Sequence, residues 1–395
     1  MKKDILIIAH YTDYFDNKGN CRFKYIIDLL PQSDVEVEFI TSDFSHIKKV
    51  KRDTSITNPS CKTTFIPEPV YSKNVCIRRF YSHYVMSRNL DEYLQQRKKP
   101  DAIYCSVPSL NVAQVAAKYA KENHIKFIID IQDLWPEAFK MMVNVPLLTD
   151  LMLYPMRRQA DYIYKAADEI VAVSNTYIKR AVRVNRKSEK QNCIYIGTDL
   201  DFFDESADFT FIKPKDEIWL AYIGTLGSSY EIEMVIDALS LLKKRGIRNI
   251  KFIVMGEGPL KERFEDYAQA QKVWAEFTGR LDYKKMAQLL KTCDIAVNPI
   301  KGGSAAGVVN KVGDYAAAAL PVINTQESQE YRELIDEYQA GFNCINGDVE
   351  DVSVRLLELA ENEHLRREMG GNNRRLEEER FDRKKTYQKI IEMLV

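Results

Sequence analysis

The chain has 395 residues, of which 45% are hydrophobic and 29% charged, and its formal net charge is zero. The length predicts two domains, and the composition excludes a disordered or low-complexity protein. A neutral chain without a basic helix carrying interleaved aromatic residues is not typical of a nucleic-acid-binding protein. Residues 1–200 nonetheless hold about seven more basic than acidic side chains, so we expect the first half to meet a negatively charged partner.

The amino-terminal apolar run is too short for a signal peptide, and no stretch reaches the roughly 18 apolar residues of a membrane span. The seven cysteines are scattered without a CxxC motif, which favours a reducing cytoplasm. The five histidines form no HExxH motif and no evident cluster on one face, so no metal site is expected. The predicted location is the cytoplasm, with peripheral attachment to the inner face of the plasma membrane left open.

Short apolar runs alternate with helical patterns along the whole chain, as in βα units on a parallel sheet. In the first half the predicted strands are 5–10, 35–41, 102–107, 126–131, 169–174 and 193–198. An acidic stretch at 199–217 interrupts the rhythm and marks a domain boundary. The predicted strands beyond it are 218–224, 251–256, 275–279, 295–300, 321–325 and 341–345. The fold class is therefore α/β, with two doubly wound parallel sheets in tandem.

The most informative motif runs from Ile295 to Thr325, where a strand, a loop of small residues and a helix starting near Val308 follow one another. Backbone N–H groups in such a loop approach a phosphate closely, and the helix N-terminus adds about half a positive charge. Lys311 and Asp314 are three residues apart and share a helix face. The lysine is suited to bind a diphosphate, and the carboxylate is suited to bind ribose hydroxyls. The alternative is a plain surface ion pair between them.

This motif resembles the signature of the retaining glycosyltransferases of family four, which have the GT-B fold. Asp314, the alanines 316–319 and Pro321-Val322 match the family's carboxylate, small-residue run and following strand. Lys311 and Tyr315 around the acid are similar to a bacterial polysaccharide or amino-sugar transferase subgroup. Three further segments resemble the family in order and spacing: the glycine loop at 222–239, the GxGP turn at 252–265 and the Gly-Arg-Leu strand end at 276–299.

The resemblance implies a donor site for a nucleotide sugar in the second half. The residues it assigns are Gly224, Thr225, Gly256, Gly279, Arg280, Leu281, Gly303, Ser304, Gly307, Val308, Val309, Lys311 and Asp314. Two departures stand out. Ala306 occupies the place of the family's first acid, and Thr225 and the following residues replace its usual arginine and lysine. The phosphate charge must then be met by Lys311 and the loop amides.

In the first half the resemblance is weaker. Gly19 and Asn20 resemble the family's first glycine loop, close to the reacting sugar, although a plain βα loop explains them equally well. Asp133 and Glu137 follow a predicted strand, at the edge where open α/β sheets bind ligands, and match an Asp-Trp-Pro-Glu element of the subgroup. They are candidates to orient the acceptor. Capping of a helix that starts at Pro136 is the alternative for Asp133.

Two segments, 71–99 and 139–165, mix arginine with aromatic residues and methionine. A basic and aromatic face suits a membrane with anionic lipids or a lipid-linked acceptor, and we prefer this interpretation for 71–99. For 139–165 we prefer Leu and Met facing the core with arginines reaching outward.

By resemblance the protein is a glycosyltransferase that retains the anomeric configuration, with Lys311, Asp133 and Gly19 nearest the chemistry. The donor is a UDP-sugar, with a GDP-sugar as second choice, and no metal is required if the helix end stabilises the leaving diphosphate. The acceptor is a saccharide or a polyprenyl-linked saccharide of a bacterial surface polysaccharide. The implied domains are 1–205 for the acceptor and 206–378 for the donor, facing each other across a cleft, with a helix at 379–395 crossing back. The alternatives are a hydrolysing nucleotide-sugar epimerase and a non-catalytic nucleotide-sugar-binding paralogue.

Overall fold

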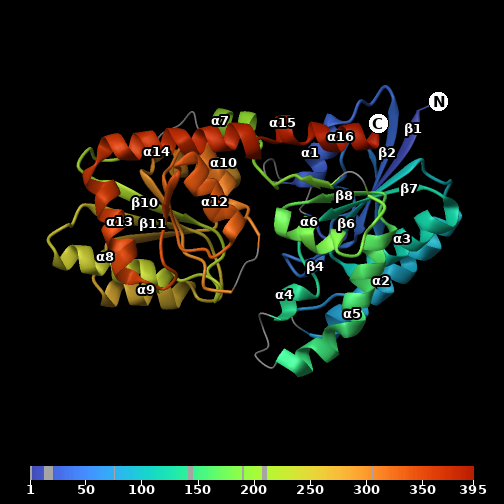
Figure 1. Cartoon of the computed structure of the whole chain (residues 1–395), viewed down its shortest axis with the longest axis horizontal. Coiled ribbons are helices and arrows are strands. Elements are labelled where there is room, and N and C mark those ends of the chain that lie inside the picture. Colours follow the sequence, from blue (N-terminus) through green and yellow to red (C-terminus); the bar gives the residue numbers. More distant parts are fainter. Residues whose placement is uncertain are drawn as a thin grey trace. The chain divides into compact units, whose positions relative to one another are not determined.

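The computed structural model describes residues 2–12, 21–74, 76–140, 146–188, 191–206, 211–303 and 307–395, with the backbone alone at 140 and 146–150. The chain divides into two compact units (Figure 1). Unit 1 comprises Met1–Tyr195 together with Thr386–Val395, and unit 2 comprises Ile196–Lys385. Each unit is built around one parallel sheet.

The sheet of unit 1 has seven strands in the order β5-β2-β1-β6-β7-β8-β9, and all neighbouring pairs are parallel. Its strands are β1 (Lys3–Ile8), β2 (Val35–Ser42), β5 (Lys62–Ile66), β6 (Ala102–Val107), β7 (Lys126–Ile131), β8 (Glu169–Ala172) and β9 (Gln191–Cys193). A small antiparallel hairpin, β3 (Phe44–Ser45) with β4 (Val50–Lys51), follows β2. The order reverses between β1 and β6, the topological switch point at which doubly wound sheets bind ligands.

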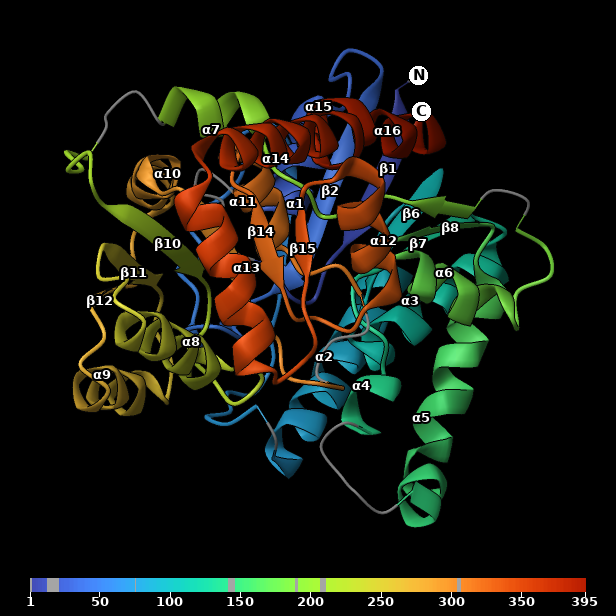
Figure 2. The same cartoon turned by 60° about the vertical axis from the view of Figure 1, so that its left-hand side comes forward.

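Helices cover this sheet on both sides. They are α1 (Arg22–Leu29), α2 (Ile77–Gln96), α3 (Leu110–Asn123), α4 (Glu137–Lys140), α5 (Pro146–Ala166), α6 (Asn175–Val182) and the C-terminal α16 (Gln388–Leu394). Apolar side chains of α1 and α16 pack on one face of the central strands, while α2, α3 and α5 lie side by side (Figure 2). The C-terminal segment is thereby part of the first core.

A buried ion pair fixes α1 to the sheet. The Arg22 guanidinium binds both carboxylate oxygens of Asp130 on β7, at 2.8 and 3.2 Å. It also donates to the Tyr195 carbonyl and to the Tyr387 hydroxyl. Because Arg22 and Asp130 are both buried, the partners that surround them compensate the loss of hydration.

Unit 2 has a six-stranded parallel sheet in the order β12-β11-β10-β13-β14-β15, with the switch point between β10 and β13. Its strands are β10 (Ile218–Ile223), β11 (Ile250–Met255), β12 (Ala275–Gly279), β13 (Ile295–Asn298), β14 (Val322–Asn324) and β15 (Gly341–Asn343). Its helices are α7 (Leu200–Ser206), α8 (Ile232–Lys244), α9 (Lys261–Ala270), α10 (Tyr283–Thr292), α11 (Lys311–Ala317), α12 (Gln329–Tyr338), α13 (Val349–Glu361) and α14 (Glu363–Leu376). A π-helical turn, η1 (Glu377–Phe381), and α15 (Arg383–Thr386) lead back to unit 1.

Two separate apolar clusters sandwich the sheet of unit 2. Along β10, Leu220 and Tyr222 belong to one cluster, whereas Trp219, Ala221 and Ile223 belong to the other. Burial on both faces explains why the strands read as continuous apolar runs in the sequence.

The predicted α/β fold class with two parallel sheets is confirmed, and each predicted strand overlaps an observed one. The sequence prediction missed β5 and the β3–β4 hairpin. No helix in the described part of the chain is long and apolar enough to cross a membrane.

Candidate functional site

In unit 2, two glycines let the loops after β10 and β11 interlock. Gly224 has a φ of +134°, and its N–H donates to the Met255 carbonyl at 3.0 Å. A Cβ atom at Gly256 would lie 1.8 Å from the Gly224 oxygen. Only glycine fits a left-handed backbone and so close a backbone approach. The two loops therefore pack backbone to backbone at the carboxyl edge of the sheet, beside the switch point.

Lys311, the first residue of α11, reaches this surface from the other side of the switch point. Its Nζ lies 3.9 Å from the ring centroid of Tyr230 and 4.1 Å from that of Tyr222. A Cβ atom at Gly224 would be 3.0 Å from the same nitrogen. The amine is thus held between two aromatic rings and faces the glycine loop.

This amine is buried and has no hydrogen-bond partner among the described residues. Burial lowers the pKa of Lys311 well below its usual range, because the charged form loses its hydration. Unpartnered buried polar groups are rare in folded proteins and mark strain or a ligand site. An anion that touched Nζ would supply the missing counter-charge.

Asp314 lies one turn further along α11 but has different partners. The Tyr283 hydroxyl donates to Asp314 Oδ1 at 2.7 Å. Burial raises the pKa of Asp314 to about 6, against the opposing effects of the Tyr283 hydrogen bond and Arg383. No ion pair joins Lys311 to Asp314 in the described contacts, so the alternative of a plain surface ion pair was wrong. The carboxylate retains further acceptor capacity for ribose hydroxyls.

The loop before α11 differs from expectation. The Gly302 N–H donates to Asn346 Oδ1 at 3.0 Å and the Gly303 N–H to Glu327 Oε2 at 3.1 Å, so protein acceptors occupy both amides. The helix starts at Lys311, not near Val308, and has seven residues. Its dipole is correspondingly small. Ser304 and Ala306 lie outside the described residues.

The remaining predicted donor-site residues follow the ends of the same strands. The Thr225 carbonyl accepts a hydrogen bond from the Tyr222 hydroxyl at 2.8 Å, which orients one ring of the lysine clamp. Gly279 ends β12, Arg280 after it is exposed, and Leu281 packs on the second core cluster. Three more predicted residues precede α11: Gly307, which is buried, and Val308 and Val309, which are half-buried.

Unit 1 contains a polar network that the sequence prediction missed. His10 follows β1 and Ser109 follows β6, and Ser109 Oγ lies 2.6 Å from His10 Nδ1 across the switch point. The other ring nitrogen, Nε2, is 3.1 Å from both carboxylate oxygens of Glu68. His83 and His46 lie nearby, so three of the five histidines are close together in the fold although the sequence shows no cluster of them on one face.

Electrostatics within this network are strongly shifted. Burial raises the pKa of Glu68, but His10 and the hydroxyls of Ser42 and Ser82 outweigh this effect and bring it to about 2. Burial, His10 and Arg79 lower the pKa of His83 to about 2. At neutral pH, Glu68 is therefore an anion and His83 a neutral imidazole.

Asp133 borders this network after β7. Its carboxylate accepts hydrogen bonds from the Leu134 N–H at 2.9 Å and the Trp135 ring nitrogen at 3.2 Å. Burial raises the pKa of Asp133 above its usual range. Glu137 forms an ion pair with Arg180 on α6. Gly19 and Asn20 lie outside the described residues.

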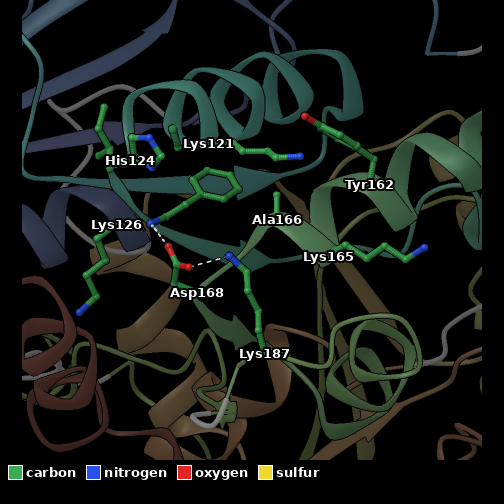
Figure 3. A pocket seen from close by; sticks show the side chains of 11 residues that line it. Lys121, His124, Lys126, Tyr162, Lys165, Ala166, Asp168 and Lys187 are labelled. Carbon is green, nitrogen blue, oxygen red and sulfur yellow. Dashed lines mark hydrogen bonds and ion pairs between the residues drawn. The ribbon is translucent and has the colours of Figure 1, made fainter.

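A pocket of about 750 Å³ opens at the amino ends of β7 and β8, the sheet edge opposite His10 (Figure 3). Lys121, Lys126, Lys165 and Lys187 line it, and Lys187 pairs with Asp168 at 2.7 Å. Lys121 and Lys165 occupy the last turns of α3 and α5, where a cation is favoured by the helix dipole. The helix dipoles account for Lys121 and Lys165, and ion pairs with Glu169 and Asp168 account for Lys126 and Lys187, so the basic lining needs no ligand. No group of His, Cys, Asp or Glu able to hold a metal occurs in the described ranges.

Comparison with solved structures shows the class of fold. Sucrose-phosphate synthase from Thermosynechococcus elongatus superposes with a TM-score of 0.74 at 14% identity, covering 99% of this chain and 98% of the other. HepE from Anabaena, solved with UDP and glucose, gives 0.68 at 14% identity over 99% and 98%. These likenesses define a GT-B-like fold.

The sequence of unit 2 is similar to a known family. Residues 204–376 match the family model "Glycosyl transferases group 1". Two uncharacterized glycosyltransferases of Methanocaldococcus jannaschii are 28% and 24% identical, over 59% and 62% of this chain. The matches cover 60% and 64% of those relatives, so the chain spans about three fifths of their length.

Proposed function

We propose that the protein is a retaining glycosyltransferase that moves a sugar from a nucleotide diphosphate donor to a saccharide or lipid-linked acceptor. Unit 2 binds the donor and unit 1 the acceptor. The family model that residues 204–376 match and the nucleotide named in the solved HepE complexes support this assignment. A UDP-sugar is the favoured donor and a GDP-sugar the second choice.

The observation that carries the proposal is the unpartnered amine of Lys311 beside Gly224 at the switch point of unit 2. A diphosphate oxygen in contact with Nζ favours the charged form of the amine, because the counter-charge offsets the cost of burial. The positive charge then acts where negative charge develops as the diphosphate leaves. Tyr222 and Tyr230 hold the amine in place by flanking it.

The transfer step breaks the bond between the anomeric carbon and the diphosphate oxygen and forms the bond to the acceptor oxygen. The acceptor proton passes to the departing diphosphate. The N–H groups of Gly307, Val308 and Val309 assist Lys311, since Gly302 and Gly303 are bound by protein acceptors. Gly224, Thr225, Gly256, Gly279, Arg280 and Leu281 shape the nucleotide side, Asp314 binds the ribose, and Ser304 contacts the phosphates.

On the acceptor side, Asp133 and the loop containing Gly19 orient the hydroxyl that attacks. Asp133 has a raised pKa and lies at the carboxyl edge of β7, where it can accept a hydrogen bond from a sugar. The polar network around His10 holds the neighbouring loops in register. We place the enzyme in bacterial surface polysaccharide synthesis, in the amino-sugar transferase-like subgroup, on the cytoplasmic side of the membrane.

The test incubates the purified chain with UDP- and GDP-sugars and measures release of nucleotide and the fate of the sugar. Slow hydrolysis that is lost in Lys311→Met but kept in Lys301→Met supports the proposal. Lys301 is the matched control because it is an exposed lysine at the start of the loop that precedes α11. Release of nucleotide with an epimerised sugar would instead identify an epimerase. Binding without turnover, with every acceptor offered, would identify a binding paralogue.

A further inference from the structure

In the first two turns of α2, polar side chains are buried and apolar side chains are exposed, the reverse of the usual arrangement. Arg79, Ser82 and His83 point into unit 1, although they are polar. Ile77, which is 89% exposed, starts an apolar stripe on the solvent side that continues with Phe80, Tyr81 and Tyr84. Their spacing of i, i+3, i+4 and i+7 places these four side chains on one helix face. An isolated exposed apolar residue needs no explanation, but a continuous stripe of this kind indicates an interaction surface.

The β3–β4 hairpin extends this stripe. Its exposed apolar residues are Ile47 and Val50, which are 56% and 50% exposed. Lys49 of the hairpin binds the Asn74 side chain, and the Arg79 guanidinium donates to the Asn74 carbonyl at 2.7 Å. The hairpin and the start of α2 are therefore held together by direct contacts. We call Ile47, Val50, Ile77, Phe80, Tyr81 and Tyr84 the apolar face.

The apolar face lies in a strongly basic stretch. Residues 44–88 contain nine Lys and Arg residues against two acids, Asp53 and Glu68. Glu68, Arg52 and Arg79 are buried, which leaves seven basic residues and one acid outside the core. Exposed Lys48, Lys73 and Arg78 flank the apolar side chains. A second copy of the chain would bring like charge against this face, which disfavours a symmetric dimer. A negatively charged partner with an apolar interior fits both features.

The amino-terminal part of α5 offers a second contact of the same kind. Leu151 and Met152 are 73% and 70% exposed, so the expectation that these Leu and Met side chains face the core was wrong. Tyr154 beside them is exposed and the Arg158 guanidinium lies 5.9 Å from its ring centroid. Figures 1 and 2 show that the amino-terminal ends of α2 and α5 project at the same end of unit 1.

We propose that this end of unit 1 docks on an anionic lipid bilayer, with the apolar face inserted at the headgroup boundary and the flanking lysines and arginines on the lipid phosphates. Aromatic and aliphatic residues beside cations are the composition of interfacial amphipathic surfaces. Each basic residue near an anionic membrane adds binding free energy, and the effect decays over the Debye length. The docked unit would receive a lipid-linked acceptor at the membrane surface. That consequence rests on the proposed function, whereas docking itself does not.

The test measures co-sedimentation of the whole chain with vesicles of phosphatidylcholine alone or mixed with phosphatidylglycerol, without donor or acceptor. We expect binding to the anionic vesicles only, with partitioning that falls at high salt. Lys73→Glu combined with Arg78→Glu should lower the partition coefficient at least tenfold. The matched control is Lys121→Glu combined with Lys165→Glu in the pocket at the opposite sheet edge, which should change it less than threefold.

The apolar contribution is tested in the same way. Ile77→Ser combined with Tyr81→Ser should lower partitioning at least tenfold, whereas Ile212→Ser combined with Ile345→Ser, two exposed apolar residues of unit 2, should not. Because all four side chains are exposed, these substitutions should leave the fold intact. A melting temperature equal to that of wild type verifies that each variant is folded. The proposal is overturned if the wild type does not bind anionic vesicles. It is equally overturned if Lys73→Glu with Arg78→Glu and Lys121→Glu with Lys165→Glu lower the partition coefficient by the same factor. It is also overturned if Ile77→Ser with Tyr81→Ser dissociates an oligomer in gel filtration.

Discussion

Replacing Glu68 by glutamine tests the buried network of unit 1. The variant keeps the shape of the side chain but removes the negative charge beside His10. A pKa that falls from 4.5 to about 2 on folding corresponds to about 3 kcal/mol of stability at neutral pH. Because the folded pKa is lowered, this stability is present above pH 4.5 and is lost as the pH falls towards 2. By the same relation about 1 kcal/mol remains at pH 3.

Denaturant unfolding of wild type and Glu68→Gln at pH 7, 4 and 3 measures this contribution. The expected difference is about 3 kcal/mol at pH 7 and shrinks as the pH falls, and for a unit of this size it corresponds to a melting-temperature loss of about 6–12 °C. Glu92→Gln, which removes an exposed carboxylate on α2, should cost less than about 0.5 kcal/mol at each pH. A Glu68→Gln difference that stays constant with pH, or one no larger than that of the control, would refute the charge argument.

Two further changes probe unit 2. Burial raises the pKa of Asp314 to about 6, so its carboxyl group favours folding below pH 4 and this contribution is lost as the pH rises through 6. In chemical denaturation, Asp314→Asn should therefore be more stable than wild type by about 1–3 kcal/mol at pH 7.5. At pH 4 the two proteins should be equally stable. An unchanged pH profile in the variant would contradict this assignment. Gly256→Ala should destabilise the protein by about 3 kcal/mol, because its Cβ atom would meet the Gly224 oxygen at 1.8 Å. Gly371→Ala in α14, where a Cβ atom meets nothing within 4 Å, should stabilise it by up to about 1 kcal/mol. Thermal unfolding of both variants measures the two effects. Equal effects of the two alanines would rule out the close backbone approach.

The sequence predicted the sheets well because their strands are buried on both faces. A strand such as β10, which faces an apolar cluster on either side, leaves an unbroken apolar run that needs no structural information to recognise. β5 was missed because it is an edge strand with the sequence KTTFI, in which polar residues dilute the pattern. The hairpin β3–β4 is too short for any periodicity.

Sequence reasoning placed Lys311 and Gly224 at one sheet edge but did not predict the side chains that Lys311 contacts. Lys311 and Gly224 follow neighbouring strands, so their meeting at one sheet edge is a consequence of the topology. The clamp of Tyr222 and Tyr230 around the lysine depends on side-chain packing and left no sequence motif. Glu68 and Ser109 lie 58 and 99 residues from His10 in the sequence. His10 and Ser109 follow strands that the sequence predicted, and polar residues gather at such strand ends, but Glu68 follows β5, which the sequence did not predict.

The occupation of Gly302 and Gly303 by Asn346 and Glu327 was beyond sequence reasoning, since both acceptors come from later loops. Because these two amides are already bound, the positive charge expected to stabilise a phosphate comes mainly from one side chain, Lys311, and less from the loop amides. The account of the donor site therefore depends on Lys311 more than the loop of small residues suggested.

Calorimetric titration of UDP into the wild type and Lys311→Met tests this point most directly. Methionine keeps the buried stem between the two rings and removes only the amine. We expect that wild type binds UDP and that the variant, still folded, binds it at least tenfold more weakly, because a charge-assisted contact of about 1.5–3 kcal/mol is lost. Equal affinity of the two proteins for UDP would contradict a diphosphate site at Lys311.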